Sequence, residues 1–217
     1  MGRTRNMQPQ ARHLRADAAR NRDKLLNSAV QVFGERGLDA PLEEIARRAK
    51  VSIGTLYNHF PTRQDLVDAI LPERLSDLER ITAEALADPD PWEGFVRFLG
   101  GLFELQARDH GLNDALARRF PDDSAVGAAC RRGFAQAEVI VGRARESGRL
   151  RADFETRDLV PLMWAMSQVI RESMEAAPEA WRRHLAFVVD GLRADAARTI
   201  AVPPLTDDQL EKLMRGR

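Results

Sequence analysis

The stretch Leu42–Phe60, L-E-E-I-A-R-R-A-K-V-S-I-G-T-L-Y-N-H-F, contains two short helical patterns that meet at a sharp corner. Apolar residues recur at helical spacing on both sides of this corner: Ile45, Ala46, Ala49, Val51, Leu56 and Phe60. Lys50 lies at the corner, and Ser52 is a natural N-cap for the second helix. Two helices joined by a turn of a few residues form a helix-turn-helix unit, whose second helix can enter a DNA major groove. The stretch therefore predicts a DNA-binding head.

The composition is that of an ordinary globular protein with one or two domains. The 217 residues are 44% hydrophobic and 30% charged. Cys130 is the single cysteine, which rules out an internal disulfide and favours a reducing, cytoplasmic location. There is no apolar run of membrane-spanning length and no signal-peptide core. The four histidines are far apart, and no nucleophile–base spacing or phosphate loop is present, so we expect no enzyme activity, cofactor or metal site.

The charge is distributed unevenly along the chain. Residues 1–63 carry 12 Arg or Lys and 6 Asp or Glu, a net charge of +6. The whole chain has 33 residues of each sign, so the remainder carries −6. A basic head on an acidic body suits a protein that meets a polyanion with one end, although an acidic membrane would fit the charge equally well.

The expected organisation is a flexible basic arm over 1–19, a helix-turn-helix domain over 20–66, a helical body over 67–199 and a tail over 200–217. The arm is expected to be disordered without DNA and to follow phosphates or a minor groove when DNA is bound. The tail contains a capping box, Thr206-x-x-Gln209, for one short helix.

The fold class is all-α, with about nine helices and no strand pattern. Pro72 predicts a kink near residues 69–71 in a long helix after Thr62. The expected helices cover residues 19–36, 52–59, 62–87, 92–108, 112–120, 124–148, 156–177 and 178–197.

The last two long helices are apolar around most of their girth, which requires burial on more than one side. We expect them to form a four-helix bundle with a second copy at a two-fold axis. The alternative is that the other helices of the same chain cover both faces. The residues expected at the dimer interface are Trp164, Ser167, Ile170, Arg171, Met174, Trp181, Leu185, Val188, Val189 and Leu192.

The run Val51–Arg63, V-S-I-G-T-L-Y-N-H-F-P-T-R, preceded by Ile45-Ala46, closely resembles TetR-family transcriptional regulators. The resemblance covers about residues 20–66, and beyond Leu66 it is only architectural. It implies a homodimer with an N-terminal DNA head and a C-terminal body that binds a small ligand. In the family the last two long helices usually build the dimer interface, which agrees with the apolar pattern above.

The resemblance implies that Ser52, Ile53, Thr55, Tyr57, Asn58 and His59 approach DNA. Arg63 replaces the usual lysine that meets a phosphate, and Lys50 replaces the usual turn glycine, which strains the corner but can add a phosphate contact. Ala40-Pro41 lacks the hydroxyl that often caps the next helix.

The side chains themselves predict a modest direct readout of bases. Asn58 can bind adenine, while Ile53 and the Thr55 methyl can meet thymine methyls. Tyr57 and His59 suit phosphates, although Tyr57 could instead be packed and His59 could cap its helix. Gly54 costs helix stability and makes sense if another backbone approaches closely.

The effector is expected to be a largely apolar small molecule that shifts the DNA heads apart and relieves repression. Candidate polar contacts are Gln106, His110 and Gln168. The residues expected to line the ligand cavity are Phe95, Phe98, Leu102, Phe103, Phe120, Phe134, Met163, Trp164 and Met166. The alternative is a DNA-binding regulator without a small ligand, controlled by a partner protein or constitutive.

Overall fold

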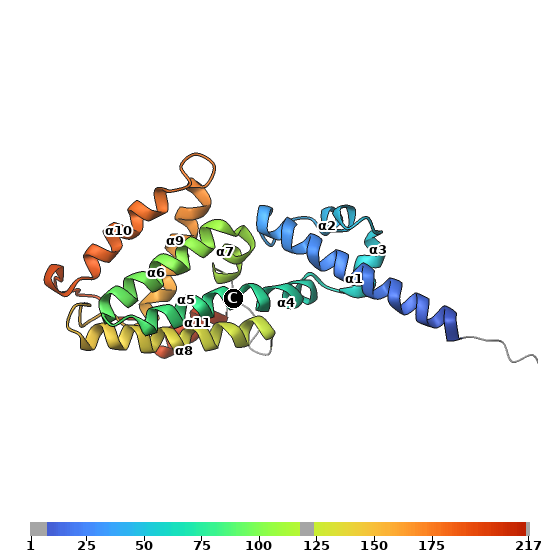
Figure 1. Cartoon of the computed structure of the whole chain (residues 1–217). Coiled ribbons are helices and arrows are strands. Elements are labelled where there is room, and N and C mark those ends of the chain that lie inside the picture. The colour runs from blue at the N-terminus through green and yellow to red at the C-terminus, as the bar shows by residue number, and fades with distance from the viewer. Residues whose placement is uncertain (1–7, 118–123, 216–217) are drawn as a thin grey trace, which may run out of the picture. The chain divides into compact units, whose positions relative to one another are not determined.

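The computed structural model describes residues 8–117 and 124–215, and these form an all-α fold, as predicted (Figure 1). The chain divides into two compact units, Met1–Ile70 and Leu71–Arg217. The described residues form α1 to α11, where about nine helices and a short helix in the tail were predicted. The difference arises because one predicted helix is in fact two. Within the described part, no helix could cross a membrane.

The N-terminal unit contains α1 (Gln8–Arg36), α2 (Leu42–Arg48), α3 (Ile53–His59) and the first part of α4 (Arg63–Arg74). Gly37 ends α1 with a φ of 77°, a left-handed conformation that glycine adopts without strain. The helices meet over fully buried side chains, which are Leu25, Ala29, Phe33, Ile45, Leu56 and Leu66. This small core stabilises α3, which is too short to be stable alone.

Helix α1 begins earlier than the sequence pattern predicts. Its first residue is Gln8, whereas the expected start was Ala19 and residues 1–19 were expected to form a flexible arm. The segment 8–19 is rich in alanine and arginine, whose intrinsic helix propensity is high even without an apolar stripe. The expected arm therefore does not include residues 8–19, and residues 1–7 lie outside the described part.

The predicted kinked helix over 62–87 is two helices, α4 (Arg63–Arg74) and α5 (Ser76–Ala87). Pro72 lies inside α4, and the interruption falls after it, at Leu75. Proline cannot bond the carbonyl four residues back, which weakens this turn. Leu75 keeps right-handed helical angles, and its carbonyl accepts from the Leu78 N–H at 3.0 Å, as in a tightened 3₁₀ turn.

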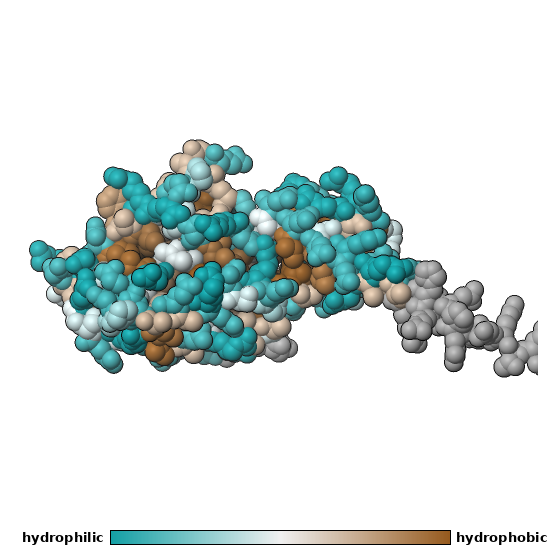
Figure 2. All heavy atoms as spheres, in the orientation of Figure 1, coloured by the Kyte–Doolittle hydropathy of each residue, from teal (hydrophilic) through white to brown (hydrophobic). Residues whose placement is uncertain are grey.

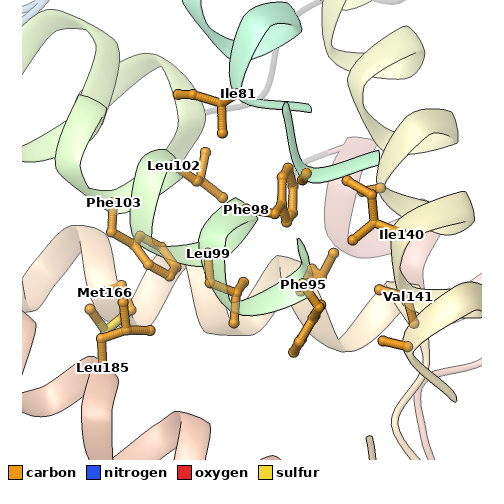
Figure 3. Close-up of a cluster of buried hydrophobic side chains, with 14 of the residues drawn as sticks. Ile81, Phe95, Phe98, Leu99, Leu102, Phe103, Ile140, Val141, Met166 and Leu185 are labelled. Atoms are coloured by element: carbon orange, nitrogen blue, oxygen red, sulfur yellow. The ribbon is translucent and has the colours of Figure 1, made fainter. Parts of the chain in front are cut away.

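The C-terminal unit is organised around α6 (Pro91–Arg108), which packs against α5, α7 (His110–Ala117), α8 (Ala125–Glu146), α9 (Leu159–Ser173) and α10 (Ala180–Leu192). Figure 3 shows the apolar side chains of α6 at the centre of this core. The members labelled there are Ile81, Phe95, Phe98, Leu99, Leu102, Phe103, Ile140, Val141, Met166 and Leu185. The burial of these side chains is the main stabilising contribution to the unit.

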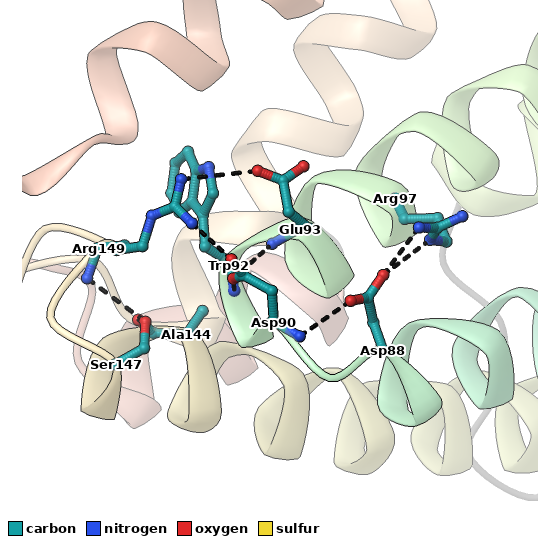
Figure 4. Close-up of polar contacts among 8 residues, drawn as sticks. All are labelled: Asp88, Asp90, Trp92, Glu93, Arg97, Ala144, Ser147 and Arg149. Carbon is teal, nitrogen blue, oxygen red and sulfur yellow. Dashed lines mark hydrogen bonds and ion pairs between the residues drawn. The ribbon is translucent and has the colours of Figure 1, made fainter.

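The turn between α5 and α6 is fixed by paired caps and ion pairs (Figure 4). The Asp90 carboxylate accepts from the Trp92 N–H at 2.9 Å, and Pro91 occupies the first helical turn, where it needs no hydrogen bond. Arg149 of the loop after α8 binds Asp90 at 2.6 Å. A side chain on Gly94 would clash with the Ala85 carbonyl oxygen, so glycine permits the close approach of α5 and α6.

The remaining elements follow the prediction with shorter limits. The predicted helix over 112–120 is α7, and residues 118–120 lie outside the described part. A 3₁₀ turn, η1 (Thr156–Asp158), precedes α9, and η2 (Ala194–Ala196) follows α10. Leu150 and Arg193 form an isolated antiparallel bridge that the sequence pattern does not predict.

The tail forms α11 (Asp207–Arg215), and the predicted capping box is confirmed. The Thr206 N–H donates to Gln209 Oε1 at 2.9 Å, and the Gln209 N–H donates to Thr206 Oγ1 at 3.2 Å.

Candidate nucleic-acid interface and internal cavity

The corner between α2 and α3 is tight and strained at one residue. The Val51 N–H donates to the Ala46 carbonyl at 3.0 Å, which closes the turn. Lys50 has a φ of 57°, the left-handed region that the corner was predicted to require. A lysine here costs roughly 1 kcal/mol more than the glycine that such turns favour. Its side chain is exposed and extends a positive charge from the corner.

Ser52 caps α3, as predicted. Its Oγ accepts from the Thr55 N–H at 3.1 Å and lies 2.8 Å from the Thr55 hydroxyl. This cap satisfies one of the free N–H groups at the start of the helix. In this arrangement the Thr55 hydroxyl is held by Ser52, so its methyl group is the part left for another contact.

The two sides of α3 have opposite roles. Leu56 and Phe60 are buried against the rest of the N-terminal unit. On the other side Ser52, Gly54, Tyr57 and Asn58 are exposed, and Tyr57 keeps 46% of its surface accessible. Ile53, Thr55 and His59 are half-buried at the edges of this face. The alternative that Tyr57 is a packing residue is therefore not supported.

Gly54 lies in open space on the exposed side of α3. A Cβ built there would meet only Ser52 Oγ, at 3.8 Å. Packing within the chain therefore does not require glycine at this position. The open space is consistent with the prediction that another molecule approaches the helix here.

Arg63 is placed differently from the expectation that it meets a phosphate. Its Nη1 donates to the carbonyl oxygens of Leu38 and Ala40 at 2.6 and 2.7 Å. Its guanidinium also lies 5.9 Å from the centre of the Phe33 ring. Pro41, the N-cap of α2, makes no side-chain cap hydrogen bond, and the loop before α2 receives hydrogen bonds from Arg63 at these two carbonyl groups. Arg63 thus ties the loop to the start of α4.

Arg48 joins α2 to α1 and does not face the exposed side of α3. Its two Nη atoms donate to the two Glu35 carboxylate oxygens at 2.8 and 2.9 Å. These hydrogen bonds hold the pKa of Glu35 below its ordinary value. Arg47 is more exposed, with 78% of its side chain accessible, and lies 3.7 Å from Glu44. Arg48 is therefore engaged within the N-terminal unit, whereas Arg47 is mainly exposed to solvent.

The C-terminal unit contains a partly open cavity of about 500 Å³. Its walls come from the α4–α5 junction, α6, α7, α8, α9 and α11, and they are mostly apolar. The volume lies in the range of small-molecule sites in proteins. The residues that line it are Leu75, Leu78, Phe98, Leu102, Ala115, Leu116, Gly127, Cys130, Arg131, Gly133, Phe134, Ala135, Ala137, Glu138, Leu159, Val160, Met163 and Leu210.

Only part of the predicted cavity lining faces this space. Phe98, Leu102, Phe134 and Met163 line the cavity, whereas Phe95, Phe103, Met166 and Trp164 do not. Phe95, Phe103 and Met166 are fully buried in the core cluster instead. Phe120 lies outside the described residues. Helical periodicity identifies a buried face, but core and cavity walls are equally apolar, so the pattern cannot separate them.

The three residues predicted as polar contacts of the ligand lie in different environments. Gln168 is exposed and donates to Glu172 at 2.7 Å. Gln106 is fully buried, and neither polar atom of its side chain has a hydrogen-bond partner among the described residues. His110 is half-buried at the start of α7. None of the three lines the cavity, while Cys130, Glu138 and Leu210 do and were not predicted.

Two family models match separate parts of the chain. "Bacterial regulatory proteins, tetR family" matches residues 25–70, and "Transcriptional regulator SbtR-like, C-terminal domain" matches residues 90–194. A TetR transcriptional regulator from Streptomyces coelicolor, known as a crystal structure, is 31% identical, with a TM-score of 0.50. That similarity covers 79% of this chain and 98% of the Streptomyces chain. The chain belongs to the TetR family of transcriptional regulators.

Two further similarities place this TetR-family chain among its relatives. It is 34% identical over 87 residues to the HTH-type regulator TtgW of Pseudomonas putida, which is 40% of this chain and 65% of TtgW. It thus matches just under two thirds of the length of that curated relative. The regulator FadR from Bacillus subtilis shares the fold, with a TM-score of 0.57 over 82% of this chain and all of FadR, at 16% identity.

Membership of the TetR family makes the chain a DNA-binding transcriptional regulator, and α2, α3 and their corner lie within the matched head. The residues predicted for the dimer interface are only partly accessible. Ser167, Ile170, Trp181 and Leu185 are buried within the TetR-family chain itself, because α9 packs against α6 and α7, and α10 packs against α6 and α9. They are unavailable to a second copy, and this part of the prediction is wrong.

The accessible surface of α9 and α10 is a different set of residues. Phe187 lies to one side of the main apolar stripe of α10 in the sequence pattern, and 61% of its surface is exposed. Figure 2 shows apolar surface in brown on the C-terminal unit, between hydrophilic areas. Trp164, Met174, Val188, Val189 and Leu192 are half-buried and Arg171 is exposed, so these six remain predictions for an interface.

Proposed function

We propose that this TetR-family regulator is a repressor that binds a palindromic operator as a homodimer and is released by a largely apolar small molecule. The observation that carries the proposal is the presence of two sites in one chain. Helix α3 carries an exposed face that supports DNA binding, and the C-terminal unit contains a partly open, mostly apolar cavity of about 500 Å³.

The exposed face of α3 supports reading of an operator with few base contacts. Asn58 is exposed and can bond both hydrogen-bonding atoms of an adenine edge. Tyr57 and His59 supply phosphate contacts, and Lys50 adds a positive charge at the corner. Because one head offers little direct readout, specificity requires two heads on a two-fold site and a contribution from DNA shape.

The continuous chain from α4 to Leu75 supports the idea that ligand binding in the cavity affects the position of the DNA-binding head. Helix α4 begins in the N-terminal unit and ends at Arg74, and the next residue, Leu75, lines the cavity. A ligand that contacts Leu75 in one arrangement of the α4–α5 junction better than in another shifts the population toward that arrangement. Two heads moved away from a spacing of one DNA turn would no longer bind both half-sites.

The fold is compatible with a large apolar ligand. FadR from Bacillus subtilis, which shares this fold at low identity, was crystallised with stearoyl-CoA. The cavity lining here is dominated by leucine, phenylalanine, alanine and methionine side chains, with Glu138 and Arg131 as charged members. The effector is therefore proposed to be mostly apolar with a small polar part.

The DNA function is tested by selecting bound sequences from a random pool at a stated salt concentration. We expect a palindromic consensus, with Asn58→Ala relaxing the preference at one base pair of each half-site. The Arg47→Ala variant, which removes an exposed side chain of α2, is the matched control and should leave the preference unchanged. Salt-dependent binding without sequence preference would contradict the proposal.

The ligand function is tested separately, by release of the selected operator in the presence of primary alcohols of eight to twelve carbons. Release by these apolar probes, and not by ethanol, supports a ligand-responsive repressor. Sequence-specific binding that no such molecule affects would favour the second candidate, a TetR-like regulator controlled by a partner protein or constitutive.

A further inference from the structure

One wall of the cavity comes from a segment far along the chain from the others. Leu210 of α11 lines the cavity together with residues of α5 to α9, such as Phe98, Cys130 and Met163. The matched C-terminal family model ends at residue 194, so α11 lies beyond the part that the model describes.

Among the described residues, the polar contacts that tie α11 and the preceding tail to the body lie at the surface. Asp207 at its start accepts from Arg157 Nη1 of η1 at 2.8 Å, and the Asp207 side chain is almost fully accessible. The tail is also tied where it leaves the body, because Arg151 Nη2 donates to the Arg198 carbonyl at 2.8 Å. Exposed ion pairs of this kind contribute little and are screened by salt.

Local interactions contribute to the stability of the helix. The Thr206 and Gln209 capping box closes its first turn, and Lys212 pairs with Asp208 at 2.7 Å within the helix. Nine residues are nevertheless too few for a stable isolated helix in water, so α11 also depends on its contacts with the body. Only Leu210 and Leu213 of its first seven residues are half-buried, and the others are exposed. With so little buried surface, the attachment of α11 to the body is weak.

We propose that α11 is a removable wall of the ligand cavity, which opens to admit an apolar molecule and whose Leu210 side chain limits the size of that molecule. The ligand part of this inference rests on the proposed function, in which this cavity holds the effector. The removable wall does not, because it follows from the position and weak attachment of α11. A segment with few buried contacts is the kind of element that opens at low free-energy cost.

The single cysteine of the chain provides a direct reporter. Cys130 lines the same cavity as Leu210, and burial raises the pKa of its thiol. Because Cys130 is half-buried in the structure, alkylation by N-ethylmaleimide at fixed pH measures how accessible the cavity is, and removal of a wall should increase the rate. Modification is followed by mass spectrometry on the full chain, and circular dichroism checks that each variant keeps its helical structure.

We expect Asp207→Asn to raise the labelling rate by about twofold to fivefold, because this variant loses one exposed ion pair between α11 and the body. Leu210→Ala should raise it as well, and a chain that ends after Leu205 should label at least about tenfold faster. Lys212→Gln is the matched control, since it breaks a pair inside α11 without touching the body or the cavity. An unchanged rate in the truncated chain, or an equal rise in Lys212→Gln and Asp207→Asn, would overturn the removable wall.

The size limit is tested with 1-octanol, 1-decanol and 1-dodecanol, with binding measured by calorimetry and by protection of Cys130. Leu210→Ala should favour the longest alcohol relative to wild type by at least about fivefold, because it enlarges the cavity at α11. An identical chain-length preference in both proteins would overturn the size limit. Faster labelling of the truncated chain together with no binding of any alcohol would overturn the proposed effector site and leave the removable wall standing.

Discussion

At Gly54, glycine lowers the stability of the helix but leaves room for DNA to approach closely. It lies inside α3, where glycine is less stable than alanine by about 1 kcal/mol, and a Cβ there meets nothing closer than 3.8 Å. We expect Gly54→Ala to raise the free energy of unfolding by about 0.5–1 kcal/mol, measured by urea denaturation. The same change should weaken operator binding about tenfold, because the added methyl occupies the exposed side of the helix.

Gly100 offers the matched control for this prediction. It lies inside α6 of the C-terminal unit, and a Cβ there would have no neighbour within 4 Å. Gly100→Ala should stabilise the chain by a similar amount and leave operator affinity unchanged. If both variants bind the operator as wild type does, close approach of DNA to Gly54 is wrong.

Gln106 is a buried amide that weakens the C-terminal core. It has no exposed surface, and among the described residues neither its Nε2 nor its Oε1 has a partner. Leaving such a group unpaired costs about 1–3 kcal/mol. We therefore expect Gln106→Leu, which has nearly the same volume, to raise the free energy of unfolding by about 1–3 kcal/mol in urea titrations.

The exposed Gln168 on α9 serves as the comparison for Gln106. Gln168→Leu removes a surface hydrogen bond to Glu172 and should change stability by less than about 0.5 kcal/mol. A Gln106→Leu protein that is less stable than wild type would mean that the amide is hydrogen-bonded in solution.

At the scale of elements, the local signals in the sequence were sufficient wherever short-range chemistry decides the structure. The Ser52 cap, the Gly37 stop, the turn before α6 and the capping box of α11 all follow from residue types at fixed spacing. The start of α1 and the division of α4 from α5 did not follow. The start of α1 depends on the intrinsic helix propensity of residues that form no apolar stripe. The division of α4 from α5 depends on the position at which the helix is interrupted because Pro72 lacks a backbone N–H.

The pairing of α1 with α2 makes the N-terminal unit sensitive to acid. Arg48 lowers the pKa of Glu35, so the ionised pair stabilises the fold above about pH 4 and this contribution is lost as pH falls below it. We expect Arg48→Gln to lower the urea midpoint at pH 7 and to lower it by less at pH 3, because the contribution of the pair declines as pH falls through the lowered pKa of Glu35. Arg47→Gln, which removes a longer and more exposed pair, should alter neither midpoint appreciably. A loss in Arg48→Gln that is equal at both pH values would contradict the role of Glu35.

At the scale of the whole molecule, the sequence predicted the division into a head and a helical body, but it could not assign each apolar residue to core, cavity or interface. Phe95, Phe103 and Met166 belong to the core, whereas Phe98 and Phe134 line the cavity. Arg63 was expected at a phosphate and instead binds carbonyls more than twenty residues earlier in the chain. These assignments depend on how helices distant in sequence pack together, which periodicity within one helix does not encode.

The surface of α9 and α10 leads to the prediction on assembly. Phe187 is 61% exposed on α10, and a large exposed aromatic side chain beside half-buried apolar residues is typical of an interface. We expect Phe187→Asp to convert the dimer to a monomer in sedimentation experiments, with unchanged circular dichroism, because the side chain contributes little to the fold of one chain. Operator affinity should fall at least about a hundredfold, since each monomer then contacts only one half-site. Val139→Asp, at a residue of α8 that is 53% exposed, is the matched control and should remain dimeric. A Phe187→Asp protein that sediments as the wild type does would place the interface on another surface of the chain.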